Sequence, residues 1–178
     1  MKATWRLGLL AACGALAIGG PMRPDKARLL GWAWLAHALA LGLHVADEAA
    51  HDFLAFYNPI ARAAQARLGL PFPPAFTFPV WLGGLVLGVA ALLACTPLAF
   101  ARRRWIAWIG VVLGIMMVAN GGSHIVGSIV MHRWLPGTWS APVLVVCAVV
   151  LVYASATVVR RGRGQAPETS AVGLRETV

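Results

Sequence analysis

The stretch HVADEAAH, residues 44–51, ends an apolar run that is long enough to cross a membrane. On a helix, residues three, four and seven positions apart share one face, so two imidazoles and two carboxylates project from this run in one direction. They belong to His44, Asp47, Glu48 and His51. Ionisable groups in a membrane span cost free energy and mark functional sites, and their partners are expected on neighbouring helices. The rest of the chain should therefore supply further spans and those partners.

The composition of the chain is that of an integral membrane protein. Of its 178 residues, 60% are hydrophobic and 12% are charged, and the mean hydropathy is +0.75. Soluble domains contain about 25% charged residues. The cysteines Cys13, Cys95 and Cys147 stand alone in apolar runs without CxxC spacing, which is typical of small buried side chains rather than of metal ligands or disulfides.

The net charge of +9 comes mainly from arginines at the ends of the apolar runs. In a soluble protein this charge would indicate a nucleic-acid partner, but the sequence has no basic patches interleaved with aromatic residues. Arginines at the ends of spans act as topology signals and as contacts to anionic lipid. We therefore expect the lipid bilayer as the partner, and no nucleic acid.

Four apolar runs have the length of a transmembrane helix, which needs about 17–25 residues. They cover residues 27–49, 79–100, 105–131 and 141–159. The predicted fold class is all-α, a polytopic membrane protein with a four-helix transmembrane bundle. The third run also contains glycines that would let neighbouring helices approach closely, namely Gly110, Gly114, Gly121, Gly122 and Gly127.

Positive charge orients the bundle, because lysine and arginine accumulate on the cytoplasmic side of a membrane. With four spans, three basic groups fall on one side, in residues 23–28, 102–104 and 160–163. The opposite side carries Arg62, Arg67 and Arg133. This pattern predicts a multi-pass protein of the bacterial inner membrane with both termini in the cytoplasm.

The predicted membrane domain covers residues 22–160, and two segments flank it. Residues 1–21 are apolar but short for a span, and three interpretations compete: a cleaved signal, a short interfacial segment, or an over-long reading frame that truly starts at Met22. A cleaved signal, or a crossing by this segment, would break the charge pattern, so the other two are favoured. Residues 161–178 are polar and are expected to form a disordered cytoplasmic tail.

The long outer loop, residues 50–78, predicts a short helix that lies in the outer interface of the membrane. This helix would cover residues 58–69, with Asn58 as its N-cap, Pro59 in its first position and Gly69 at its C-terminal end. A segment rich in proline and phenylalanine then returns the chain to the membrane.

The third span carries the expected partners, because Asn120 and His124 are four residues apart and face one way. A helix rises about 1.5 Å per residue, so His44 and Asn120 both lie about 24 Å from the arginines that begin their spans. By the same measure, Glu48 and His124 both lie about 30 Å from those arginines. Since the first and third spans run in the same direction, the two polar sets should meet beneath the outer surface.

Electrostatics constrains the two carboxylates further. Asp47 and Glu48 sit at the C-terminal end of the first span, where the helix dipole disfavours negative charge. Protonation, a protonated histidine or a bound cation would relieve this. The turn of residues 134–140 closes at the same level, and Thr138 or Ser140 could cap the fourth span there.

Three short motifs in the chain resemble those of the HXXEE family of small bacterial membrane proteins. They are HVADE at residues 44–48, NGGSH at 120–124 and PGT at 136–138, in the order of the family's HXXEE, NXXXH and PGT motifs. The resemblance covers roughly residues 27–158 and departs from the pattern at Asp47, which keeps the charge of glutamate but is one methylene shorter. The family has no established activity, so the resemblance implies a site without naming a reaction.

The chemistry of these residues favours a metal site. Imidazole nitrogen and carboxylate oxygen from two helices suit zinc or iron, so His44, Glu48 and His124 are the predicted ligands of a divalent ion. Asp47, Glu48 and Asn120 are the predicted catalytic residues, with Asp47 as a further ligand or general base. Four residues are expected to position a lipid-like or small amphipathic substrate, namely His51, Pro136, Gly137 and Thr138.

The predicted function is therefore a metal-dependent membrane hydrolase or oxidase whose site lies near the periplasmic leaflet, and two alternatives stay open. The protein could handle protons or cations or serve as an auxiliary membrane protein. Its histidine–carboxylate network could also be purely structural. His37, in mid-membrane, is expected to be a hydrogen-bonded core histidine, and the alternative is a haem ligand paired with His44 or His124.

Overall fold

The computed structural model of the chain describes residues 28–161. This part contains five helices and no strand: α2 (Leu29–Ala50), α3 (Phe53–Leu68), α4 (Phe78–Phe100), α5 (Arg104–Val130) and α6 (Ala141–Arg161). All except α3 are long and apolar enough to cross a membrane. The predicted all-α fold with four spans is confirmed, whereas the predicted N-terminal segment and C-terminal tail lie outside the described residues.

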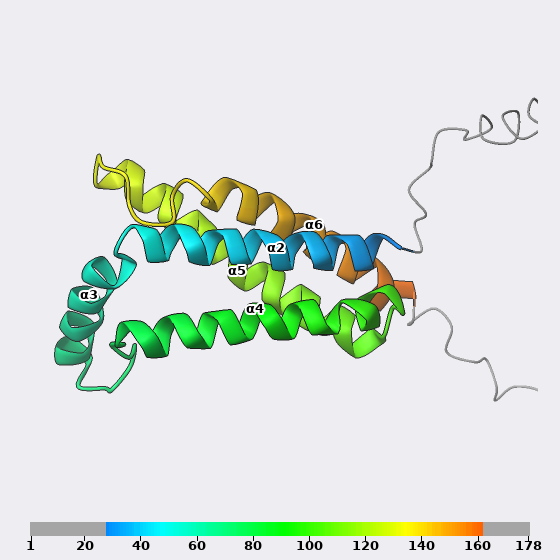
Figure 1. Ribbon diagram of the computed structural model, residues 1–178, viewed down its shortest axis with the longest axis horizontal. Helices are drawn as coiled ribbons and strands as arrows, with labels where there is room; N and C mark the ends of the chain where they lie inside the picture. The colour runs from blue at the N-terminus through cyan, green and yellow to red at the C-terminus, as the bar shows by residue number, and fades with distance from the viewer. Residues whose placement is uncertain (1–27, 162–178) are drawn as a thin grey trace, which may run out of the picture.

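The four long helices alternate in direction (Figure 1). Helices α2 and α5 run in parallel toward the end of the bundle where α3 lies, and α4 and α6 run back. The arginines that begin α5 and end α6 therefore gather at one end, as the charge pattern predicted. The polar residues late in α2 and α5 share the opposite end.

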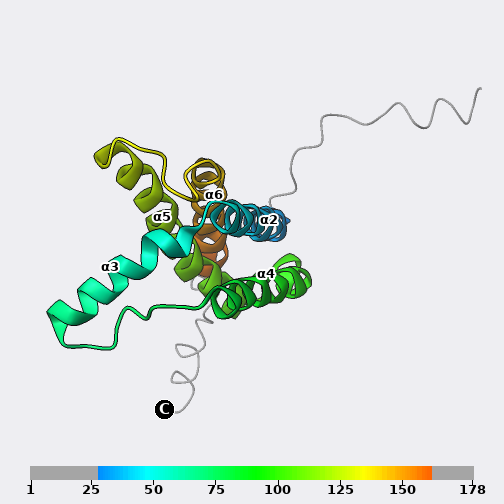
Figure 2. The ribbon, with the colours of Figure 1, turned by 60° about the vertical axis from the view of Figure 1, so that its left-hand side comes forward.

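The helices pack against one another in the order α4, α2, α6 and α5, and α4 barely touches α5. Figure 2 shows this arrangement from near the helix ends, with α3 extending away across the end of the bundle. Helix α4 contributes only Trp81 and Ala99 to the buried residues of the described chain. The bundle is therefore less tightly packed between α4 and α5.

The apolar core lies at the arginine-rich end of the bundle and joins all four long helices. Its members are Leu30, Ala33, Trp34, Ala99, Ile106, Ala107, Leu151, Ala154 and Val159. The Trp34 indole N–H donates a hydrogen bond of 2.7 Å to the Leu92 carbonyl, which ties α2 to α4. The core thus fixes one end of the bundle, while polar contacts join the helices at the other end.

Small residues bring α5 and α6 together, as expected from the glycines of the third span. A Cβ atom on Gly114 would lie 2.6 Å from Val152 Cγ2, and one on Gly121 would also meet α6 side chains and backbone. Gly110 faces Ser155 in the same way. The expectation was wrong for Gly122, which has open space around its Cβ position, and for Gly127, whose Cβ would meet Leu135 in the turn after α5 rather than a neighbouring helix.

The outer helix begins earlier than the sequence predicted. Helix α3 starts at Phe53, so Pro59 lies inside it and Asn58 is not its N-cap. The Asn58 side chain is instead engaged with the returning loop, since it donates to the Phe76 carbonyl at 2.9 Å and accepts from the Phe76 N–H at 3.0 Å. The C-terminal end was predicted correctly, because Gly69 adopts the left-handed conformation that ends the helix.

His37 was expected to be a hydrogen-bonded core histidine, and this was wrong in part. The side chain is 1% exposed, so it is a core residue. Neither ring nitrogen, however, has a hydrogen-bond partner among the described residues. Helix packing buries this imidazole. The spacing of residues along the sequence does not show whether a hydrogen-bond donor or acceptor lies beside it.

Candidate metal centre

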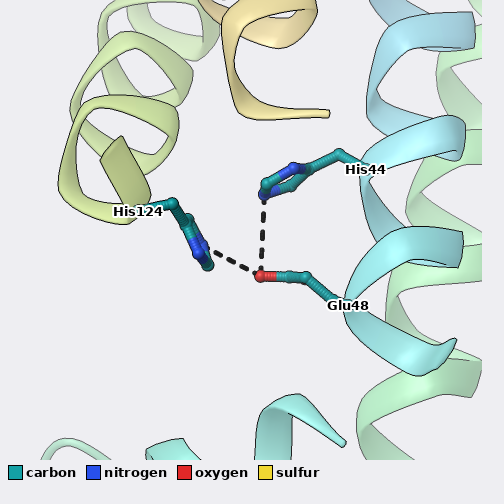
Figure 3. A group of neighbouring side chains, drawn as sticks. All are labelled: His44, Glu48 and His124. Carbon is teal, nitrogen blue, oxygen red and sulfur yellow. Dashed lines mark ion pairs between the residues drawn. The ribbon is translucent and has the colours of Figure 1, made fainter. Parts of the chain in front are cut away.

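The side chains of His44, Glu48 and His124 converge between α2 and α5, as the depth argument predicted. Glu48 Oε1 lies 3.1 Å from His124 Nε2 and 3.6 Å from His44 Nε2. One ligand atom from each residue lies within 4.8 Å of the others. Figure 3 shows the three side chains pointing toward one another, two from α2 and one from α5. This group is called the triad below.

The triad is shielded from solvent. His44 is 1% exposed, Glu48 5% and His124 6%. Burying a carboxylate costs free energy unless a positive charge or hydrogen-bond donors compensate. The triad therefore needs a cation or a shared proton at its centre.

Hydrogen bonds outside the triad assign the protons on both imidazoles. The Ser140 hydroxyl donates to Asp47 Oδ2 at 2.7 Å, so its oxygen accepts from His44 Nδ1, which lies 2.9 Å away. His124 Nδ1 lies 2.6 Å from the Pro136 carbonyl oxygen, which can only accept. In the neutral imidazoles, both Nε2 atoms then carry lone pairs that face Glu48.

This arrangement fits a metal ion. Histidine ligands of metals commonly donate their other ring N–H to a carbonyl or carboxylate, which orients the ring and raises its basicity. With zinc–ligand bonds of about 2.0–2.1 Å, tetrahedral ligand atoms lie about 3.3 Å apart. The separations of 3.1 and 3.6 Å around Glu48 Oε1 are close to that value. The three residues could hold a metal ion.

Asn120 lies at the same centre, on the His44 side. Its side-chain amide donates a hydrogen bond of 3.2 Å to His44 Nε2, the nitrogen that would coordinate an ion. The amide is half-buried, and it stands one helical turn before His124 on α5. Asn120 is thus placed to contact a ligand of the triad, and its predicted catalytic role stays a prediction.

The expectation that both carboxylates project in one direction was wrong, because the Asp47 carboxylate faces the start of α6 rather than the triad. Its Oδ2 accepts from the Ser140 N–H at 3.0 Å and from the Ser140 hydroxyl, and its Oδ1 lies 2.9 Å from His51 Nδ1. The positive end of the α6 dipole thus compensates a carboxylate that the end of α2 disfavours. Asp47 orients His44 through Ser140, and its predicted role as ligand or general base stays a prediction.

The turn that contains the PGT motif closes over the triad with backbone atoms. Gly137 has a φ of +84°, and a Cβ atom there would lie 3.0 Å from both Glu48 Cγ and His124 Cε1. The Thr138 hydroxyl bonds the Ser128 hydroxyl at 2.6 Å, which joins the turn to α5. The structure therefore places the PGT residues against the triad, whereas His51 is exposed and reaches it only through Asp47.

Aromatic side chains flank the triad on the side of α3 and α4. The Phe53 ring lies 5.7 Å from the His124 ring and stacks on both Tyr57 and Trp81. A cavity of about 360 Å³, which we call the aromatic cavity, adjoins this cluster. Its lining is formed by Phe53, Tyr57, Phe76, Val80, Trp81, Gly84 and Leu85. Phe53 thus separates His124 from an apolar space large enough for part of a ligand.

Sequence reasoning missed two residues of this site. Ser140 was considered only as a helix cap, although it links Asp47 to His44. The available signal was the position of Ser140 at the start of the fourth span, level with His44, where its hydroxyl could bond the imidazole. Phe53 follows the polar stretch by two positions, and no periodic pattern marks it as a neighbour of His124.

Comparison with known proteins identifies a family and no characterised relative. The family model described as "Protein of unknown function with HXXEE motif" matches residues 9–152. No curated protein matches the chain, and no solved structure does. The motif in this description corresponds to residues 44–48, where the triad begins.

Proposed function

Since the chain belongs to the HXXEE family, whose function is unknown, we propose that it is a metal-dependent membrane enzyme. The metal would be a divalent ion, zinc or iron, held by His44, Glu48 and His124. The site would lie near the periplasmic leaflet of a bacterial inner membrane. Hydrolysis is the favoured reaction and oxidation is the alternative.

One observation supports this proposal above the others. Both Nδ1 atoms of the triad histidines are engaged outside the triad, so both Nε2 lone pairs and a carboxylate oxygen meet at one point. Three such groups repel one another unless a cation or a shared proton lies between them. A structural network without an ion would be expected to supply donors there, and within residues 28–161 the one donor that approaches is the Asn120 amide.

The favoured chemistry follows from the number of ligands. A zinc ion with three protein ligands keeps an open position and activates water for hydrolysis without a further cofactor. A bound ion would take the single lone pair of His44 Nε2, so the Asn120 amide would leave that nitrogen and hydrogen-bond a substrate or another ligand beside the open position. Asp47 and Ser140 would hold the His44 ring, and the PGT turn would hold the His124 ring and exclude bulk water.

The substrate would be lipid-like or a small amphiphile. The aromatic cavity is apolar, lies at the outer end of the bundle and adjoins His124 through Phe53. Helices α4 and α5 barely touch on this side, so an acyl chain could approach laterally from the membrane. Displacement of the Phe53 ring would bring such a substrate to the triad.

Metal analysis of the full chain purified in detergent tests the proposal. We expect roughly one zinc or iron ion per wild-type chain, and loss of most of it in Glu48→Gln, which preserves side-chain shape, and in His44→Ala. His132→Asn is the matched control, because His132 is exposed beyond α5 and lies outside the triad. Wild-type protein without stoichiometric metal would end the proposal.

The second candidate is proton or cation handling. A buried carboxylate 3.1 Å from an imidazole can share a proton with it, and this observation favours the alternative. Metal-free wild-type protein that conducts protons in proteoliposomes, with no flux in Glu48→Gln, would support it. If both assays are silent and the same variants only lower the unfolding temperature, the network is structural.

A further inference from the structure

A second cavity lies at the α3 end of the bundle, and its largely apolar lining includes charged side chains. It has a volume of about 520 Å³ and lies between α3 and the turn that follows α5. Asp52 and Arg133 both line it. We call it the outer cavity. The proposed metal site does not use it.

The two charged residues of the outer cavity carry opposite charges but do not pair. The ion pairs of the described residues all involve the histidines at positions 44, 51 and 124, and none joins Asp52 to Arg133. The Arg133 guanidinium carbon lies 5.9 Å from the centre of the Phe56 ring, so the side chain is held against α3. The outer cavity thus offers the unpaired charges of Arg133 and Asp52 to an occupant, whereas His51, which also lines it, is engaged by Asp47 at 2.9 Å.

An apolar groove of about 460 Å³ begins on the other side of the same turn. Ile125, Ile129 and Pro142 form its apolar walls, and Arg133 and Trp134 line both the groove and the outer cavity. The groove therefore adjoins the outer cavity at Arg133 and Trp134 and follows α5 from Ile129 back to Ile125.

The level of this turn matches the headgroup region of a bilayer. Helix α5 has 27 residues, which gives a length of about 40 Å, and Arg133 follows its end. Trp134 and Trp139 lie in the same turn and stack with ring centres 4.4 Å apart. Tryptophan is enriched at membrane interfaces.

We propose that the outer cavity and the groove together bind one phosphatidylethanolamine-type phospholipid. The phosphate contacts Arg133, the primary ammonium contacts Asp52, and one acyl chain lies along Ile125 and Ile129. Charge complementarity supports this assignment. The outer cavity presents the cation of Arg133 and the anion of Asp52, and this headgroup carries a phosphate anion and an ammonium cation. Phosphatidylglycerol has no ammonium for Asp52, and the quaternary ammonium of phosphatidylcholine has no N–H to donate.

Lipid binding to the full chain, measured by native mass spectrometry from detergent with lipids of identical acyl chains, tests this proposal. We expect wild-type protein to retain phosphatidylethanolamine about tenfold more strongly than phosphatidylglycerol or phosphatidylcholine. Arg133→Gln should lose about tenfold in this retention, and Arg133→Lys should lose less. Asp52→Asn should abolish the preference over phosphatidylglycerol, and asparagine tolerates the positive φ at this position.

Arg67→Gln is the matched control, because Arg67 is an exposed arginine at the end of α3 and lines neither the groove nor the outer cavity. Equal retention of the three lipids by wild-type protein would overturn the proposal. So would a preference for phosphatidylglycerol, or an Arg133→Gln variant that behaves like Arg67→Gln. The result does not depend on metal content, so this proposal and the metal-dependent function fail separately.

Discussion

At the scale of single residues, the adjacent carboxylates of Asp47 and Glu48 have different partners. Asp47 and Glu48 differ by about 100° around α2, so one faces the start of α6 and the other faces the two histidines. Asp47 stabilises the N-terminal end of α6 and Glu48 completes the triad. Ser140 connects these two tasks, because its hydroxyl touches both Asp47 and His44.

Ser140→Ala should weaken metal binding without unfolding the bundle. The change removes the acceptor for His44 Nδ1–H and one donor to Asp47, so the His44 ring loses its fixed orientation. Loss of such an outer partner typically lowers metal affinity about 10–100-fold. Competition for zinc with a chromogenic chelator measures this, with Thr157→Ala, on α6 but far from the triad, as the control. Unchanged affinity would show that Ser140 does not orient the ligand.

Gly137→Ala should destabilise the protein, because alanine would be strained in this backbone conformation and its Cβ would crowd the triad. The backbone has a φ of +84°, and the new Cβ would lie 3.0 Å from Glu48 and His124 atoms. We expect a loss of about 1–3 kcal/mol in the free energy of unfolding. Gly122→Ala, which meets open space inside α5, should instead be neutral or slightly stabilising. Equal unfolding temperatures for the two variants in detergent would contradict this account.

The triad could be predicted from sequence because helical spacing and depth are both set by backbone geometry. His44 and Glu48 are one turn apart, and His124 reaches the same level on a parallel span. The partners outside the triad could not be predicted in this way. The partner of the Asp47 side chain depends on which helix packs beside α2, and the path of the PGT turn depends on turn conformation; spacing fixes neither of them.

At the scale of helices, apolar length predicted the four spans well, whereas for α3 the signals predicted the end at Gly69 correctly and the start wrongly. Asn58 and Pro59 are a common helix start, yet α3 already begins at Phe53. The hydrogen bonds of Asn58 to Phe76 lie 18 residues away in sequence, so local propensity carries no sign of them. This displaced start is what places Phe53 beside His124.

Helix α4 forms one wall of the aromatic cavity, and Gly84 on this wall offers a direct test of the substrate class. Gly84→Leu should fill the cavity, because nothing lies within 4 Å of a Cβ at this position. A photoactivatable fatty acid should label residues 78–89 of wild-type protein, and labelling should fall about tenfold in the variant. Gly88→Leu places the same side chain in open space outside the cavity and should label like wild type. Equal labelling in both variants would exclude an acyl chain from this cavity.

At the scale of the whole molecule, the sequence predicts which ends of the spans meet, but not which helices are neighbours. Arginine positions and span number set the alternation of direction, and the described helices follow it. The packing order α4, α2, α6, α5 depends on side-chain fit, and spans that are apolar on every side do not encode it in their periodicity. The glycines of α5 indicated close packing, and the structure assigns α6 as the partner.

The orientation of the bundle determines on which side of the membrane the triad lies, and this orientation can be measured in cells. The arginine-rich end should face the cytoplasm, which would place α3 and the triad near the periplasmic leaflet. In a variant with Cys13, Cys95 and Cys147 replaced by alanine, a cysteine introduced by Arg67→Cys on α3 should react with a membrane-impermeant maleimide in intact bacteria. A cysteine introduced by Arg103→Cys, before α5, should react only after permeabilisation. The reverse pattern would place the triad on the cytoplasmic side and remove the periplasmic assignment of the proposed enzyme.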